Sequence, residues 1–125
     1  MTGRTLLDTC VVIDFLRGRQ GAIALIKALA LQPAISSVSV AETFAGLRSQ
    51  REERAVRQFF SDMKIVSVDA ILAERAGAFL RHYSRSHSMD IPDALIAATA
   101  EQHGLTLATL NVKHFPMFDK LKPAY

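Results

Sequence analysis

The sequence has a single cysteine, Cys10, and no tryptophan among its 125 residues. One cysteine excludes an internal disulfide and a multi-cysteine metal cage within this chain. No apolar run approaches the length of a membrane-spanning helix, since even residues 21–35 are interrupted by Lys27. Arg4 and Asp8 leave no room for the apolar centre of a secretory signal in the first ten residues. These absences favour a reducing compartment, and we expect the protein in the cytoplasm.

The chain also lacks a glycine-rich turn after any predicted strand, so nucleotide binding of the Rossmann or P-loop kind is not supported. Half of the residues are hydrophobic and 22% are charged, which excludes a disordered chain. The net charge of +3 is compatible with a nucleic acid or an acidic protein as partner but does not require one. With no linker or repeat, residues 1–125 are predicted to form one domain.

Strands and helices are predicted to alternate along the chain. Apolar patterns and breaks predict strands at residues 4–8, 34–38, 64–68 and 105–110, with helices at 11–16, 22–31, 39–48, 52–63, 70–83 and from 93 onward. Helices long enough to serve as crossovers imply a mainly parallel sheet that is covered on both faces. The predicted fold is therefore an α/β three-layer sandwich with four or five strands.

Polar residues are predicted to gather at the carboxyl edge of this sheet, where such folds bind ligands. Asp8 ends the first strand beside Thr9, and Glu42 lies in the first turn of the helix that follows the second strand. Asp93 begins a helix that leads back to a parallel strand, so that helix starts at the same edge. Asn111 follows the last strand. Three acids and an amide from distant parts of the chain thus converge.

Each of the later acids also has a purely structural interpretation. Asp90 can cap the helix at its N-terminus, and Asp93 then faces the positive end of the helix dipole. Ser39 and Glu42 have the S-x-x-E spacing of a capping box, with Ser39 as the N-cap. Both interpretations explain the residues without a function, and both remain open.

Carboxylates that converge repel one another and raise one another's pKa unless a cation neutralises them. A hard divalent ion such as Mg²⁺ or Mn²⁺ takes oxygen ligands and keeps positions for water and a substrate phosphate. The expected chemistry is metal-assisted hydrolysis of a phosphodiester, in which the ion activates water and stabilises the developing charge.

Three stretches, "LLDTCVVIDFLRG", "SVSVAETFAGL" and "IPDALIAATAEQHGLTLATLNVKHF", resemble the successive motifs of PIN-domain ribonucleases, and specifically of the VapC toxins of bacterial toxin–antitoxin pairs. The resemblance implies a PIN fold, Mg²⁺- or Mn²⁺-dependent endoribonuclease activity, a homodimer and a cognate VapB antitoxin. It makes Asp8, Glu42 and Asp93 the metal-site acids and Thr9 the hydroxyl that supports Asp8. Two positions depart from the pattern, because Asn111 and His114 stand where members of the family often have acids.

The segment "RHYSRSH", residues 81–87, carries basic and aromatic groups shortly before Asp93. Arg81, Tyr83, Arg85 and His87 are candidates for holding phosphates and stacking a base of single-stranded RNA. An exposed helix end explains the same residues equally well. Cys10 has no histidine or lysine placed by the sequence to activate it, so a small buried residue is the expected role.

Two other functions are compatible with parts of the sequence. A phosphoacceptor receiver domain would bind Mg²⁺ and accept phosphate at Asp69, but it needs paired acids after the first strand, where only Asp8 stands. A catalytically weak module that binds RNA or protein would keep the fold and its partner without the activity. Metal-dependent RNA cleavage separates both from the nuclease.

Overall fold

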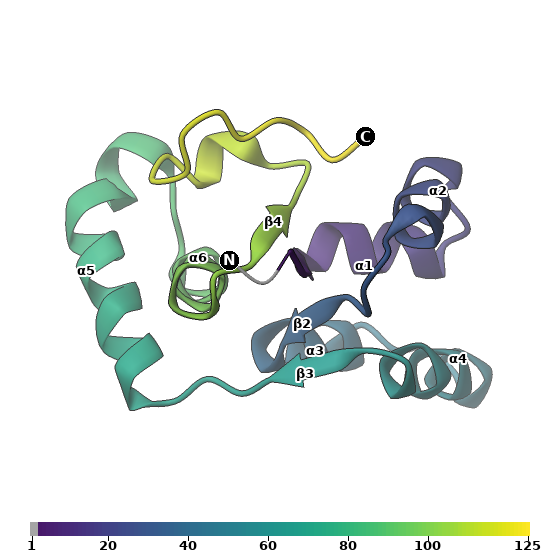
Figure 1. Ribbon diagram of the computed structural model, residues 1–125. Helices are drawn as coiled ribbons and strands as arrows, with labels where there is room; N and C mark the ends of the chain where they lie inside the picture. The colour runs from purple at the N-terminus through teal and green to yellow at the C-terminus, as the bar shows by residue number, and fades with distance from the viewer. Residues whose placement is uncertain (1–2) are drawn as a thin grey trace.

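Residues 3–125, the part that the computed structural model describes, contain four strands, six α-helices and one 3-10 helix (Figure 1). In chain order they are β1 (Thr5–Leu7), α1 (Thr9–Leu16), α2 (Gln20–Ala28), β2 (Ala34–Ser36), α3 (Ser37–Ala45), α4 (Gln50–Ser61), β3 (Lys64–Val66), α5 (Ala70–His87), α6 (Ile91–His103), β4 (Thr106–Ala108) and η1 (Val112–His114). The predicted alternation of strands and helices is confirmed.

The four strands form one sheet in the order β3-β2-β1-β4, and all three pairings are parallel. In the register of the central strand, Leu6 lies opposite Leu107 and Leu7 opposite Ala108. The pairing of β1 with β4 continues one residue past the end of β1, because the Asp8 amide donates to the Ala108 carbonyl at 2.9 Å. The predicted parallel sheet of four or five strands is confirmed with four strands.

Successive strand residues point to opposite faces of the sheet and bury two separate cores. Leu6, Ala34 and Leu107 belong to a core shared with α5 and α6. Leu7 and Ile35 belong to a second core on the other face, which α1, α2 and α4 supply with apolar side chains. The pattern of the short strands thus produces the three layers of the predicted sandwich.

Several predicted boundaries differ from the structure by one to four residues, and two of the differences affect residues of interest. The second strand ends at Ser36, whose hydroxyl accepts the Val38 N–H at 3.1 Å and caps α3, so Ser39 is a helical residue and not the N-cap. The predicted capping box of Ser39 with Glu42 therefore does not form. The other difference is the end of α5, which continues past Tyr83 to His87, since no glycine or proline lies between Tyr83 and Ser88. Ser88 then adopts a left-handed conformation (φ 54°) and ends the helix.

Helix α6 has a local capping residue at each end. Asp90 caps its N-terminus, and Gly104 closes its C-terminus in the left-handed conformation (φ 62°), which glycine adopts without steric cost. The helix leads directly into β4, so it runs against the strands and starts at their carboxyl ends. No helix within residues 3–125 is long and apolar enough to cross a membrane.

Candidate active site

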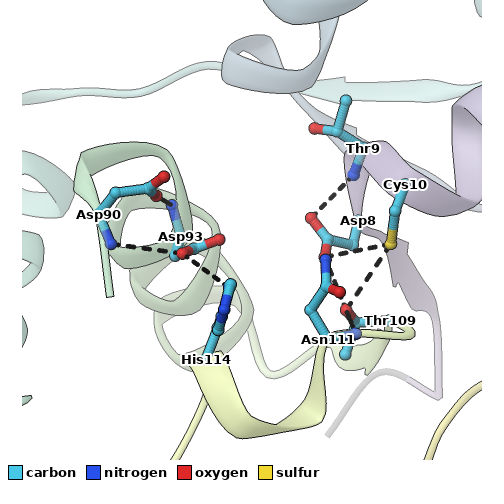
Figure 2. A network of polar contacts seen from close by, with 8 residues as sticks. All are labelled: Asp8, Thr9, Cys10, Asp90, Asp93, Thr109, Asn111 and His114. Atoms are coloured by element: carbon cyan, nitrogen blue, oxygen red, sulfur yellow. Dashed lines mark hydrogen bonds and ion pairs between the residues drawn. The ribbon is translucent and has the colours of Figure 1, made fainter. Parts of the chain in front are cut away.

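Asp8 is the most constrained of the candidate residues. It stands between β1 and α1, is only 4% exposed and caps α1, with Oδ1 accepting the Thr9 N–H at 2.8 Å. Its other oxygen, Oδ2, accepts the Thr109 hydroxyl at 2.6 Å. Because both carboxylate oxygens have donors, the orientation of this buried side chain is fixed on two sides (Figure 2).

Glu42 is joined to Asp8 through Thr9. The Thr9 hydroxyl lies 2.7 Å from Glu42 Oε1 and 2.7 Å from the hydroxyl of Ser39, which is fully buried. Helix α3 thereby presents both Ser39 and Glu42 to the N-terminus of α1. The resemblance assigned the Thr9 hydroxyl to Asp8, but this hydroxyl contacts Glu42 and Ser39, and the Thr9 backbone amide is the group that bonds to Asp8. Ser39 has a role that the S-x-x-E spacing did not indicate.

Asp93 lies in the first turn of α6 within a capping box. Its amide donates to Asp90 Oδ1 at 3.0 Å, and its Oδ2 accepts the Asp90 amide at 3.3 Å. The same Oδ2 lies 3.3 Å from Nδ1 of His114. Partial burial, together with the hydrogen bond to Asp90, raises the pKa of Asp93 from 3.8 to about 6. Asp93 is thus part of the capping box whose N-cap is Asp90, and its carboxylate also lies at the sheet edge, so both sequence interpretations stay open.

Asn111 reaches the site through its backbone, since its amide donates to the Thr109 hydroxyl oxygen at 2.9 Å. Its side chain is exposed. Thr109 itself is fully buried and belongs to the same network, although a threonine at the end of an apolar strand carries no signal that would single it out. Asp8, Thr109 and Asn111 therefore form one connected group at the end of β1 and β4.

The candidate acids form two groups in the structure. Asp8 and Glu42 share Thr9. Asp93 instead bonds to Asp90 and lies against His114 (Figure 2). Among residues 3–125, no three histidine, cysteine or acidic side chains lie close enough together to hold a metal ion. The donors are nevertheless oxygen atoms, which is the set that Mg²⁺ and Mn²⁺ prefer. The chemistry of the residues fits such an ion, and binding would have to draw the two groups together.

Arg81, Tyr83, Arg85 and His87 lie on the last turns of α5, just before the loop that leads to α6. Arg81 and Arg85 are exposed. The Tyr83 ring contacts the ring of His87 at a centroid distance of 5.8 Å and also packs against the apolar core. Tyr83 therefore contributes to the packing of the core, and the exposed side chains of Arg81 and Arg85 are the groups accessible to a ligand.

Cys10 is half-buried beside Asp8, with Sγ 3.5 Å from Asp8 Oδ2. Burial and the nearby Asp8 charge raise the pKa of its thiol above 9.0. A thiol that holds its proton at neutral pH is a poor nucleophile. Cys10 is therefore a packing neighbour of Asp8.

A groove of about 240 Å³ opens beside Glu42 between α1, α3 and α4. Its apolar lining includes Ile13, Leu16, Leu47 and Val56, and it also contacts Arg17, Arg48 and Ala55. Because Glu42 also lines the groove, a chain bound there would lie next to this candidate acid.

Fold and site together define a class of protein, an α/β domain whose acidic side chains stand at the carboxyl edge of a parallel sheet. The PIN domain family matches residues 5–121, and the chain belongs to that family. The family resemblance of the three sequence motifs is confirmed.

Characterised relatives and solved structures agree with this assignment. The chain is 44% identical over 123 residues to Ribonuclease VapC10 of Mycobacterium tuberculosis, covering 96% of this chain and 92% of the relative, and 39% identical over 124 residues to Ribonuclease VapC19 of the same species, covering 96% and 98%. It also matches a toxin–antitoxin complex from Klebsiella pneumoniae with a TM-score of 0.84 and 31% identity, covering 97% of this chain and 98% of that chain.

Proposed function

We propose that this protein is a Mg²⁺- or Mn²⁺-dependent endoribonuclease that acts as the toxin of a toxin–antitoxin pair. The observation that carries the proposal is the buried Asp8, fixed at the sheet edge and joined through Thr9 to Glu42. The 44% identity with a VapC ribonuclease over nearly the whole chain supports the same activity. A receiver domain is not favoured, because Asp69 caps α5 and lines a separate cleft with Arg4, Lys64 and His103.

Each candidate residue has a distinct role in this proposal. Asp8, Glu42 and Asp93 would hold the ion, and Asn111 would add a neutral oxygen in place of a fourth acid. When bound, the ion lowers the pKa of an attacking water and stabilises the charge on the phosphate. Thr9 orients Glu42 relative to Asp8, since its hydroxyl touches the first and its amide touches the second. His114 lies against Asp93 on the side of η1.

The end of α5 would hold the RNA. Arg81 and Arg85 are exposed there, and guanidinium groups bind phosphates through several N–H donors. Tyr83 and His87 place aromatic rings beside them, which suits stacking of an unpaired base. This segment leads into the loop before Asp90, so RNA bound to it would lie near Asp93.

Cleavage of RNA by the purified protein in Mg²⁺ or Mn²⁺ tests the activity. We expect EDTA to abolish cleavage. Asp8→Asn, Glu42→Gln and Asp93→Asn should each lower the cleavage rate to a small fraction of the wild-type rate. Asp69→Asn is the matched control, because Asp69 is also an N-cap, asparagine caps equally well, and the residue lies in a different cleft. Wild-type rates in all three site variants would overturn the proposed activity and favour a module that only binds.

The proposed partner is a VapB-type antitoxin whose bound segment occupies the groove beside Glu42. Structures similar to this chain include toxin–antitoxin complexes, such as the one from Klebsiella pneumoniae. A basic side chain carried by that segment would replace the ion that the acids need. The complex is therefore expected to cleave RNA more slowly than the free protein.

Ala55 offers a direct test of this groove, because it is exposed on α4 and lines the groove. Ala55→Glu should weaken antitoxin binding measured by calorimetry while RNA cleavage by the free protein stays unchanged. Ala73→Glu makes the same substitution on exposed α5, outside the groove, and should leave binding intact. Equal affinity of both variants for the antitoxin, or full activity of the complex, would contradict the proposed inhibition.

A homodimer in the cytoplasm completes the proposal. RNA and the antitoxin are both available in that compartment, and the lone cysteine suits its reducing conditions. Sedimentation equilibrium of the protein alone and of its complex tests the dimer.

A further inference from the structure

Thr109 occupies a position in the Asp8 network that makes it more than a packing residue. It is fully buried, and its hydroxyl has a fixed hydrogen-bonding direction. The Asn111 N–H donates to its oxygen at 2.9 Å, and its own proton points to Asp8 Oδ2 at 2.6 Å. A hydroxyl has only one proton, so Thr109 is committed to the Asp8 carboxylate.

Asp8 has no equivalent donor to replace this one. The Thr9 N–H is bonded to the other oxygen, Oδ1. The remaining neighbour of Oδ2 is the thiol of Cys10 at 3.5 Å, which is a weak donor. Because Asp8 is 4% exposed and Thr109 is 0% exposed, water has little access to the place of the hydroxyl. Loss of the Thr109 hydroxyl would therefore leave Oδ2 with only a weak partner.

The backbone of Thr109 is held on both sides. Asp8 donates to the carbonyl of the preceding Ala108 at 2.9 Å, and the Thr109 carbonyl accepts the Ala124 N–H at 2.9 Å. Ala124 belongs to the C-terminal segment, where the Tyr125 hydroxyl donates to Asp14 Oδ2 on α1 at 2.6 Å. Thr109 is thus anchored to the sheet and to the C-terminal segment, as a residue that orients another must be.

We propose that Thr109 is a positioning residue that holds Asp8 in the orientation needed to bind the metal ion. Its hydroxyl also links the backbone of Asn111 to the Asp8 carboxylate. The inference rests on the proposed function, because it assigns Asp8 to an ion. Partners that orient a metal ligand typically change metal affinity by about 10- to 100-fold when they are removed. A threonine that only filled space would leave metal affinity unchanged.

Calorimetric titration of the metal-free protein with Mn²⁺ tests the role without measuring activity. Thr109→Val keeps the shape of the side chain and removes the hydroxyl, so we expect Mn²⁺ affinity to fall at least about 10-fold. Thr109→Ser restores the hydroxyl and should bind Mn²⁺ nearly as the wild type does. Thr99→Val is the matched control, since Thr99 is also fully buried but donates to the Leu95 carbonyl within α6.

The outcomes separate this inference from the proposed function. A folded Thr109→Val that binds Mn²⁺ as tightly as the wild type overturns the inference alone. A wild type that binds no Mn²⁺ overturns the inference and the proposed metal dependence together. If Thr109→Val does not fold, Thr109→Cys keeps a side chain of similar size with a weak donor and is expected to show the same loss. Failure of both variants to fold would make Thr109 a structural residue and overturn the inference.

Discussion

Asp8 and Asp93 each stand at the N-terminus of a helix at the same sheet edge, yet they are held in different ways. Asp93 bonds to Asp90, three residues away, so one helical turn supplies most of its environment. Asp8 bonds to Thr109, which is 101 residues away in sequence, and this contact exists only when β1 and β4 are paired. The position of Asp93 therefore depends mainly on local structure, whereas that of Asp8 depends on the complete fold.

The difference in burial follows from the difference in partners. The Asp93 side chain is 14% exposed, whereas Asp8 is 4% exposed with donors on both oxygens. A buried hydrogen-bonding group that loses its partner cannot turn to water, so the cost of removal is larger. We infer that the Asp8 network carries more of the stability of the fold than the capping box of α6.

The largest predicted effect is the stability difference between Asp8→Ala and Asp90→Ala. The first leaves the Thr109 hydroxyl and the Thr9 N–H without their acceptor, at a cost of about 2–3 kcal/mol. The second removes an N-cap and should cost about 1 kcal/mol. Urea unfolding of the metal-free proteins measures both, and Asp8→Asn, which keeps one oxygen acceptor, should lose less than Asp8→Ala. Equal losses for Asp8→Ala and Asp90→Ala would remove the distinction between the two acids.

A second prediction asks whether the two groups of acids meet at one ion. Asn111→Asp adds a charge near Asp8 and should tighten Mn²⁺ binding by about 1–2 kcal/mol, the order expected for a charged group in place of a neutral one. In the Asp93→Asn background this gain should shrink, because residues that share an ion are coupled. Calorimetry on the four proteins of the cycle gives the coupling energy. An identical gain with and without Asp93 would mean that the two groups do not share a metal.

The sequence was sufficient wherever the relevant contacts are local. Asp90 and Asp93 indicated the start of α6, because caps depend on residues within one turn. The alternation of strands with helices was sufficient for a parallel sheet, and the sheet placed Asp8 and Asn111 at one edge.

Contacts between residues far apart in the sequence were harder to predict from the sequence. Three serines, at positions 36, 37 and 39, could each cap α3, and the choice of Ser36 depends on where β2 stops pairing with β3. Ser39 is instead buried against Thr9. Thr109 was missed because a threonine in an apolar strand carries no mark of a partner 101 residues away. Spacing predicts which edge a residue reaches, and only packing decides what it touches there.

The smallest predicted effect tests whether burial or sequence separation sets the energy of a contact. Glu101, near the opposite end of α6 from Asp93, pairs with Arg75 of α5, with Nε to Oε1 at 2.6 Å and Nη2 to Oε2 at 2.9 Å. The pair joins residues 26 apart in sequence, but its side chains are 45% and 42% exposed. Solvent screening should therefore make its contribution to stability at neutral pH the smallest of the effects compared here.

The hydrogen bonds from Arg75 lower the pKa of Glu101, and this sets the sign of the pH dependence. A carboxylate whose pKa is lower in the folded state contributes stability above its unfolded pKa and loses that stability as the pH falls through the folded value. Glu101→Gln should thus be less stable than the wild type at pH 7 and equally stable near pH 3 in urea unfolding, whereas Glu74→Gln, another exposed glutamate substitution, should change little at either pH. A loss at pH 7 as large as that of Asp8→Ala would show that long sequence separation alone, without burial, makes a contact strong.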